Sequence, residues 1–254
     1  MTGKLYVIGV GPGDPELFTL KALRILKEVS CICVPKGREE GSSLALSIVQ
    51  KAVSMEGKEI IEAHFPMVKS AEARKRRSAE VSQASKLPNS QASELDAKWD
   101  ETAKNVLSRL DKGTDVAFIT LGDPTIFSTF FYLYDRLLES NPNLGMAIIP
   151  GVSSITAASA QAKISLGLAD EKIAILPANY IGNLKETLER FDTIVLMKIH
   201  KVFGDVLKVL DETGLTRNAV YVSRAGMDDE MIFKDIKEIK ESDLNYFSVM
   251  IIKK

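Results

Sequence analysis

Short apolar runs alternate with helical patterns over the first part of the chain, and this alternation limits the possible folds more than any other feature. The apolar runs predict strands at residues 5–10, 31–35, 59–65, 115–121 and 146–151. Helical periodicity lies between them, near residues 15–29, 42–53, 93–112 and 126–140. Parallel strands need a crossover connection, which is usually a helix. The pattern therefore predicts a mainly parallel sheet that is covered by helices.

The second part of the chain has a different order of predicted strands and helices. After a helix near residues 153–162, apolar runs follow at 172–177, 193–198, 219–224, 230–236 and 246–252. The last three runs leave no room for helices between them, so their sheet should be mixed, with an antiparallel portion at its end. We predict two α/β domains, residues 1–121 and 122–254, joined near 122–126 with a cleft between them.

Composition and charge exclude several classes of protein. The formal net charge of -1 argues against a chain whose main task is to bind nucleic acid. No apolar stretch approaches ~20 residues, and the first residues lack the apolar core of a signal peptide, so we expect a cytoplasmic protein without a membrane span. Cys31 and Cys33 should share one face of a strand without forming a disulfide. His64 and His200 lack metal-ligand spacing, and we expect no metal site in the protein.

Residues 68–93 interrupt the alternation. This segment has almost no large apolar side chains, contains the basic run 74–77, and is otherwise rich in Ser, Gln and Ala. Such a composition buries too little surface to offset the entropy of ordering, so we predict an exposed insertion. The basic run suits a solvated face better than a polyanion site.

The segment "GVGPGDPEL" (9–17) places three glycines at the end of the first predicted strand. Their spacing is G-x-G-x-G, whereas the dinucleotide-binding fingerprint is G-x-G-x-x-G. Pro12 removes an amide donor, and Asp14 followed by Pro15 is typical of an N-cap and a first helical residue. Asp14 would then occupy the helix end that a pyrophosphate needs. The loop favours a small uncharged or cationic ligand.

An NADP-binding reductase remains an alternative at this point. The second strand, "CICVPKGR", lacks the acidic residue that holds a ribose in NAD sites and supplies Lys36 and Arg38 instead. These two cations would suit a 2′-phosphate, although the glycine spacing does not fit the fingerprint.

Two further turns carry related chemistry. "TLGDPTIFST" contains Gly122, Asp123 and Pro124 after the fourth strand, and "IIPGVSS" contains Gly151 before two serines. The carboxyl ends of parallel strands meet at one edge of the sheet, where open α/β sheets bind ligands. The turns therefore predict a ligand site, the alternative being that they are no more than well-capped strand-to-helix turns.

Taken in order, "GVGPGDPELFTLKA", "TLGDPTIFSTF" and "PGVSS" resemble the tetrapyrrole methylase family, whose members use S-adenosylmethionine to methylate corrin precursors. "HFPM" (64–67), Trp99 and "SRAGMDDE" (223–230) resemble the branch that methylates the C(20) meso carbon of precorrin-2 or cobalt-factor II. The resemblance spans nearly the whole chain except residues 68–93. It implies two α/β domains, S-adenosylmethionine or its product S-adenosylhomocysteine in the cleft, a small-molecule tetrapyrrole substrate and a homodimer. Segment 126–138 suits such an interface, although burial in the core explains it equally well.

Site residues follow from the resemblance position by position. It implies cofactor contacts at Pro12, Leu121, Gly122, Asp123, Ile126, Ser153, Ser154, Pro177, Ala178, Met197 and Ala225. Gly11 and Gly13 would belong to the wall that faces the tetrapyrrole. Because such substrates carry several carboxylates, cations at predicted strand ends are candidates for substrate contact, with plain solvent exposure as the alternative: Lys36, Arg38, Lys198, His200 and Arg224.

The implied reaction needs little from the protein beyond orientation. The sulfonium methyl is already electrophilic, so no covalent nucleophile is required. A general base would help the methylated carbon to lose its proton. Related uroporphyrinogen methylases carry an Asp after the second strand, but "VPKGRE" has none, so no catalytic residue is predicted. Two alternatives stay open, namely methylation of another ring carbon and a non-catalytic tetrapyrrole-binding protein.

Overall fold

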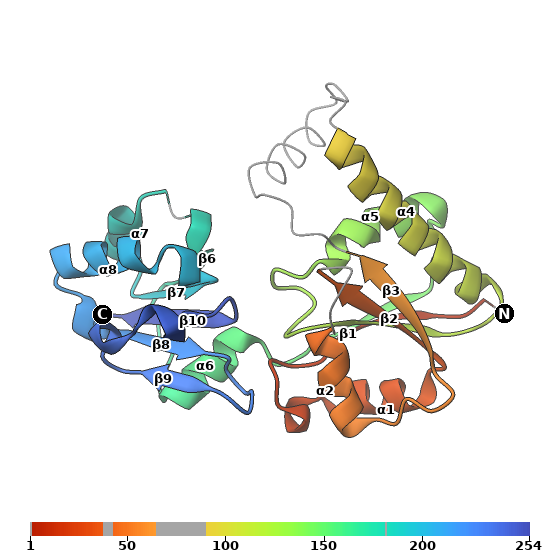
Figure 1. The fold of residues 1–254 in the computed structure, drawn as a ribbon, viewed down its shortest axis with the longest axis horizontal. Coiled ribbons are helices and arrows are strands. Elements are labelled where there is room, and N and C mark those ends of the chain that lie inside the picture. Colours follow the sequence, from red (N-terminus) through yellow and green to blue (C-terminus); the bar gives the residue numbers. More distant parts are fainter. Residues whose placement is uncertain (1, 38–42, 65–89, 181) are drawn as a thin grey trace. The chain divides into compact units, whose positions relative to one another are not determined.

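The protein forms two compact α/β units (Figure 1). A computed structural model describes residues 2–37, 43–64, 90–180 and 182–254. The first unit comprises Met1–Val10 and Phe18–Gly151, and the second comprises Gly11–Leu17 and Val152–Lys254. The glycine-rich segment thus follows a strand of the first unit but belongs to the second. Segment 122–151, which lies beyond the predicted boundary at 121/122, packs with the first unit.

The first unit contains a five-stranded sheet in the order β3-β2-β4-β1-β5. All four strand pairs are parallel, which confirms the predicted parallel sheet. β1 occupies an inner position, with Leu5 opposite Val116 of β4 and Met146 of β5. The strands are β1 (Leu5–Gly9), β2 (Cys31–Lys36), β3 (Glu59–His64), β4 (Val116–Thr120) and β5 (Met146–Ile149).

Helices cover both faces of this sheet, as Figure 1 shows. One apolar cluster joins the sheet to α1 (Leu20–Glu28) and α2 (Leu44–Ala52). A second cluster joins the opposite face to α4 (Ser90–Asp111) and α5 (Phe130–Ser140). The period of two along a strand sends alternate side chains to the two clusters.

The two cysteines share one face of β2, as predicted, and both are free thiols. Burial, with a smaller contribution from Glu59, raises the pKa of Cys31 to about 11. Burial also raises the pKa of Cys33. Because the thiolate is the reactive form, both side chains act as small apolar core residues.

The second unit contains a mixed sheet in the order β6-β7-β10-β8-β9. β6 and β7 are parallel, whereas β10 pairs antiparallel with β7 and β8, and β9 pairs antiparallel with β8. This confirms the predicted mixed sheet, since only two short 3-10 turns lie between β9 and β10. The strands are β6 (Ile173–Pro177), β7 (Thr193–Met197), β8 (Ala219–Ser223), β9 (Met231–Phe233) and β10 (Ser248–Lys253).

In the described part of the second unit, three α-helices flank the sheet. α6 (Ser154–Ala162), rich in alanine, packs closely on β8 and β10. The opposite face carries α7 (Leu184–Arg190) and α8 (Phe203–Glu212). We did not predict α7 and α8, although their buried residues recur at helical spacing.

Two predicted helices begin later than their patterns indicate. The predicted helix 15–29 is a single 3-10 turn, η1 (Pro15–Leu17), followed by α1, whose N-cap Thr19 accepts a bond from the Ala22 amide. The predicted helix 126–140 begins only at Phe130, because Phe127 has a positive φ of 52°. Within the described ranges, no helix combines the length and the apolar character needed to cross a membrane.

Candidate functional site

Three glycines meet at the carboxyl edge of the first sheet, where β4, β1 and β5 end. A Cβ atom on Gly9 would lie 2.5 Å from the Gly122 carbonyl oxygen and 2.7 Å from the Gly151 amide nitrogen. A Cβ atom on Gly151 would lie 2.8 Å from the Cα atom of Gly9. The three turns therefore approach at backbone distance, which only glycine permits.

Asp123 ties two of these turns together. One carboxylate oxygen accepts a hydrogen bond from the Gly151 amide at 3.0 Å. The other accepts bonds from the amide of Thr125, at 2.8 Å, and from its hydroxyl group. Both oxygens of this predicted cofactor ligand therefore already bind groups of the first unit. This geometry indicates that the Asp123 side chain fixes the shape of the turn.

The glycine-rich segment Gly11–Leu17 folds with the second unit and provides few amide donors. The Glu16 amide donates to the Asp14 carboxylate at 2.8 Å, and the Leu17 amide donates to the Asp14 carbonyl at 3.1 Å. Pro12 and Pro15 have no amide hydrogen. Asp14 thus takes the cap as predicted, but it caps one 3-10 turn. Segment 12–17 therefore lacks the amide cradle that a pyrophosphate requires.

This segment packs against the loop that follows β8. A Cβ atom on Gly13 would meet Met227 at 2.5 Å and the Gly226 carbonyl oxygen at 2.7 Å. Gly226 has a φ of +74°, and a Cβ there would approach Pro12 at 3.1 Å. Ala225, in the same loop, is buried. Pro12, Gly13 and Ala225, which were predicted from separate parts of the sequence, are thus drawn together within the second unit.

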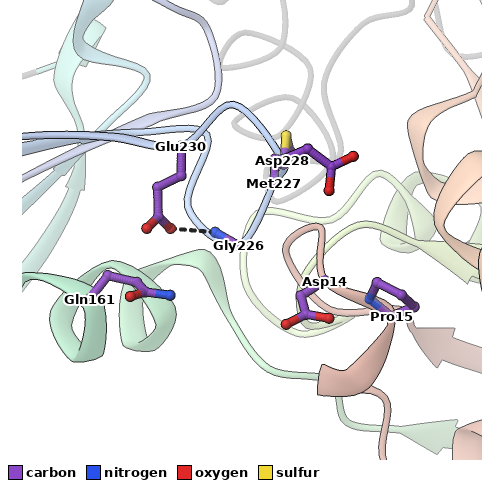
Figure 2. A pocket seen from close by; sticks show the side chains of 7 residues that line it. All are labelled: Asp14, Pro15, Gln161, Gly226, Met227, Asp228 and Glu230. Carbon is purple, nitrogen blue, oxygen red and sulfur yellow. Dashed lines mark hydrogen bonds between the residues drawn. The ribbon is translucent and has the colours of Figure 1, made fainter.

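A pocket of about 300 Å³ opens beside these two loops in the second unit (Figure 2). Glu230, in its wall, accepts a hydrogen bond from the Gly226 amide at 2.6 Å. The lining residues are Asp14, Pro15, Gln161, Gly226, Met227, Asp228 and Glu230. Its acidic lining opposes polycarboxylate or phosphate ligands. It contains none of the predicted site residues.

The remaining cofactor candidates of the second unit lie at strand and helix ends. Ser153 is buried and caps α6, accepting a bond from the Ile155 amide at 3.2 Å, while Ser154 is the first helical residue. Pro177 and Met197 end the parallel strands β6 and β7 directly opposite each other. Ala178 is buried in the core cluster, so it offers little side-chain surface.

Most of the cationic candidates are already engaged. The Lys36 ammonium lies 2.6 Å from the Glu62 carboxylate, and the Arg224 guanidinium pairs with Asp229. The hydrogen bond from Arg224 lowers the pKa of Asp229. Lys198 has its ammonium 5.5 Å from the centroid of the Tyr246 ring, a cation–π contact. Arg38 lies outside the described residues.

His200 is partly buried and packs edge-on against Tyr246, with ring centroids 5.6 Å apart. Its buried Nδ1 has no hydrogen-bond partner within the described part of the chain. Burial, followed by the nearby Lys201 charge, lowers the pKa of His200 below its ordinary value of 6.5. A backbone hydrogen bond to Lys198 acts in the opposite direction. The neutral imidazole is therefore favoured, which weakens the case for a cationic substrate contact.

The lowered pKa of His200 predicts a pH dependence of stability. The folded protein binds this proton less tightly than the unfolded chain, so the contribution is intact above the ordinary pKa and is lost as pH falls below it. Urea unfolding should show a free energy of unfolding that declines between neutral and mildly acidic pH. His200→Gln should flatten that decline. Parallel pH profiles for the two proteins would contradict the assignment.

The sequence did not reveal the contacts that organise these residues. Gly9, Gly122 and Gly151 were each visible as turn residues, but their mutual approach joins segments far apart in the chain. The Asp123 bond to Gly151 and the Glu230 bond to Gly226 were missed for the same reason. The local signal that the sequence offered for these contacts was the glycine at each turn.

Comparison with known proteins identifies the family of this chain. The family model described as Tetrapyrrole (Corrin/Porphyrin) Methylases matches residues 4–240. The cobalt-precorrin-2 C(20)-methyltransferase of Salmonella typhimurium is 32% identical over 256 residues, covering 100% of this chain and 98% of that protein. A Methanocaldococcus jannaschii protein named "Probable cobalt-precorrin-2 C(20)-methyltransferase" is 34% identical over 257 residues, covering 99% of this chain and 96% of that protein.

A solved structure also matches the fold. The uroporphyrin-III C-methyltransferase from Thermus thermophilus, complexed with S-adenosylhomocysteine, superimposes with a TM-score of 0.63 at 20% identity. The match covers 99% of this chain and 92% of that one. The family match overturns the NADP-reductase alternative, in agreement with the Glu16 and Leu17 amides that donate to Asp14. This protein belongs to the family of tetrapyrrole (corrin/porphyrin) methylases.

Proposed function

We propose that the protein is an S-adenosylmethionine-dependent methyltransferase of cobalamin biosynthesis that acts on the C(20) meso carbon of a precorrin-2-type macrocycle. The observation that carries this proposal is the match, along essentially the whole chain, to two relatives named for that reaction. Both names specify a cobalt-containing substrate, so we propose the cobalt form as the preferred one. The metal is then part of the substrate.

The described residues fit S-adenosylmethionine. This cofactor carries no phosphate, and in the glycine-rich segment the Glu16 and Leu17 amides donate to Asp14, while Pro12 and Pro15 have no amide hydrogen. Pro177 and Met197, side by side at two strand ends, offer apolar contact for a flat base. Ser153 and Ser154 add hydroxyl groups, and the Ser153 hydroxyl keeps its own proton free to donate while it accepts the cap bond. We propose that these second-unit residues contact the cofactor.

The cofactor supplies an electrophilic methyl group. When this cofactor is bound, C(20) of the macrocycle would attack its methyl carbon, so that a C–C bond would form as the C–S bond broke and S-adenosylhomocysteine left. C(20) then loses its proton to a base, which restores the ring double bond. The chain's task is to hold the ring carbon in line with the methyl group. The Asp123 turn, rigid through its two-sided hydrogen bonding, provides fixed backbone for that purpose.

Turnover tests this proposal directly. Anaerobic calorimetry should detect binding of S-adenosylhomocysteine, and mass spectrometry should show a gain of one methyl group on cobalt-factor II, with less on metal-free precorrin-2. Isotope-labelled NMR should place the new methyl on C(20). A methyl on another carbon would move the assignment within the family. Binding of tetrapyrrole without any transfer would favour the non-catalytic alternative.

We further propose a cytoplasmic homodimer, which the family resemblance implies. Helix α5 supports both readings of segment 126–138, because Phe130, Leu133 and Leu137 are buried in the core while Phe131 and Tyr132 stay 41% and 48% exposed. Sedimentation velocity should show one species of twice the chain mass. A single species at the chain mass would exclude the dimer.

A further inference from the structure

Phe127 combines two unfavourable features. Its φ of 52° lies in the left-handed region, which bulky side chains rarely adopt. Its side chain is also 48% exposed, although it is large and apolar. A residue with a strained backbone and an exposed apolar side chain contributes little to the stability of the folded protein. Such outliers concentrate at functional sites, where the surrounding structure enforces them.

The neighbouring residues hold Phe127 in this conformation from both sides. Before it, the Asp123 carboxylate binds the amide of Thr125 at 2.8 Å. After it, the hydroxyl of Ser128 lies 3.3 Å from the hydroxyl of Thr120 and accepts a bond from the Phe130 amide at 3.2 Å. Two anchored turns thus flank Ile126 and Phe127, and of these two residues Phe127 is the exposed one. The second anchor ties the loop to the last residue of β4, Thr120, and to the first residue of α5, Phe130, so the position of the Phe127 ring is set by the fold around the loop.

The other exposed aromatic side chains of this region have partners that account for them. Phe131 packs edge-on against Phe130, with centroids 5.6 Å apart, and Tyr132 stacks on Trp99 at 5.2 Å. Among the described residues, no ring makes such a contact with Phe127. Its exposed face is therefore available for a flat apolar partner.

We propose that Phe127 is a platform on which one face of the tetrapyrrole macrocycle rests. The inference rests on the proposed function, which supplies a wide conjugated ring as substrate. Aromatic faces associate by offset stacking, and burial of both faces adds a hydrophobic gain. Because Phe127 lies four residues beyond Asp123 on the same loop, ring contact there fixes the macrocycle relative to that turn. Phe127 acts as a positioning residue and takes no part in proton transfer.

Phe127→Asn separates this role from a structural one. Asparagine tolerates the left-handed conformation, so the variant should unfold at the same or a higher temperature than the wild type. Affinity for S-adenosylhomocysteine should be unchanged. The Kd for cobalt-factor II, measured with S-adenosylhomocysteine present, and the KM in turnover should both rise by about tenfold, while kcat changes little. Phe127→Tyr, which keeps the ring, should restore wild-type values.

Phe131→Asn is the matched control. It removes an exposed aromatic that has ring partners, so it should lower the unfolding temperature and leave the Kd for cobalt-factor II unchanged. Sedimentation velocity on each variant shows whether a change in assembly contributes. Phe127→Gly replaces Phe127→Asn if the latter is not folded. If the folded Phe127 variant turns over like the wild type and its Kd for cobalt-factor II is unchanged, Phe127 is not a platform. The proposed function would stand in that case. Failure of the wild type to bind either tetrapyrrole overturns the proposed function as well.

Discussion

Replacement of Gly9 by alanine is expected to abolish stable folding of the first unit. The new Cβ would lie 2.5 Å from the Gly122 carbonyl oxygen and 2.7 Å from the Gly151 amide nitrogen. Both obstacles are backbone atoms of neighbouring strand ends, so no side chain can rotate away. Relief would require three parallel strands to separate at one edge. The loss should exceed ~4 kcal/mol, which is a large fraction of the stability of an ordinary domain.

Circular dichroism and denaturant titration of Gly9→Ala would measure this loss. Gly145→Ala, just before β5 in the same unit, is the matched control, because a Cβ there meets no atom within 4 Å. The control should unfold close to the wild-type midpoint. A Gly9→Ala protein with a wild-type midpoint would show that the three turns do not approach as described.

Asp123→Ala is expected to weaken binding of S-adenosylhomocysteine by about tenfold or more and to lower stability by ~2 kcal/mol, a typical value for hydrogen bonds to a charged group. The substitution leaves the Gly151 amide and both donors of Thr125 without their acceptor. The turn that carries Leu121, Gly122 and Ile126 would then lose its fixed shape. Calorimetry with S-adenosylhomocysteine and urea unfolding would measure the two effects.

A control at the opposite edge of the same sheet separates the two effects. Asp115 accepts a hydrogen bond from the Lys4 amide at 2.7 Å, where β1 and β4 begin. Asp115→Ala should therefore lower stability and leave cofactor affinity unchanged. If Asp123→Ala loses stability but binds S-adenosylhomocysteine like the wild type, the Asp123 turn is no part of the cofactor site.

The strands were largely predictable because each is a local signal. Apolar runs of the right length located all ten strands of the described residues, and the segments between these runs predicted a parallel and a mixed sheet. Turn residues such as Asp14 and Ser153 were also recognisable, since capping depends on neighbours two or three positions away. Short helices such as α7 were missed because one or two turns carry little periodic signal.

The sequence identified candidate site residues, but it did not predict how they are arranged in space. Asp123 was identified, but its bond to Gly151 links residues 28 positions apart, and no local pattern encodes it. Lys36 looked like a free cation, since its partner Glu62 lies on the neighbouring strand. Phe127 continued a helical pattern, and only the anchors on either side force it out of the helix. Such features depend on tertiary contacts that override local propensity.

The path of the chain gives the two units an unusual interdependence. It passes from one to the other after Val10, after Leu17 and again after Gly151. A cut at the last of these places would leave Gly11–Leu17, against which Gly226 and Met227 pack, on the wrong fragment. Neither unit is therefore a module that recombination can exchange as one continuous stretch of gene. The pair of units is therefore expected to be inherited together.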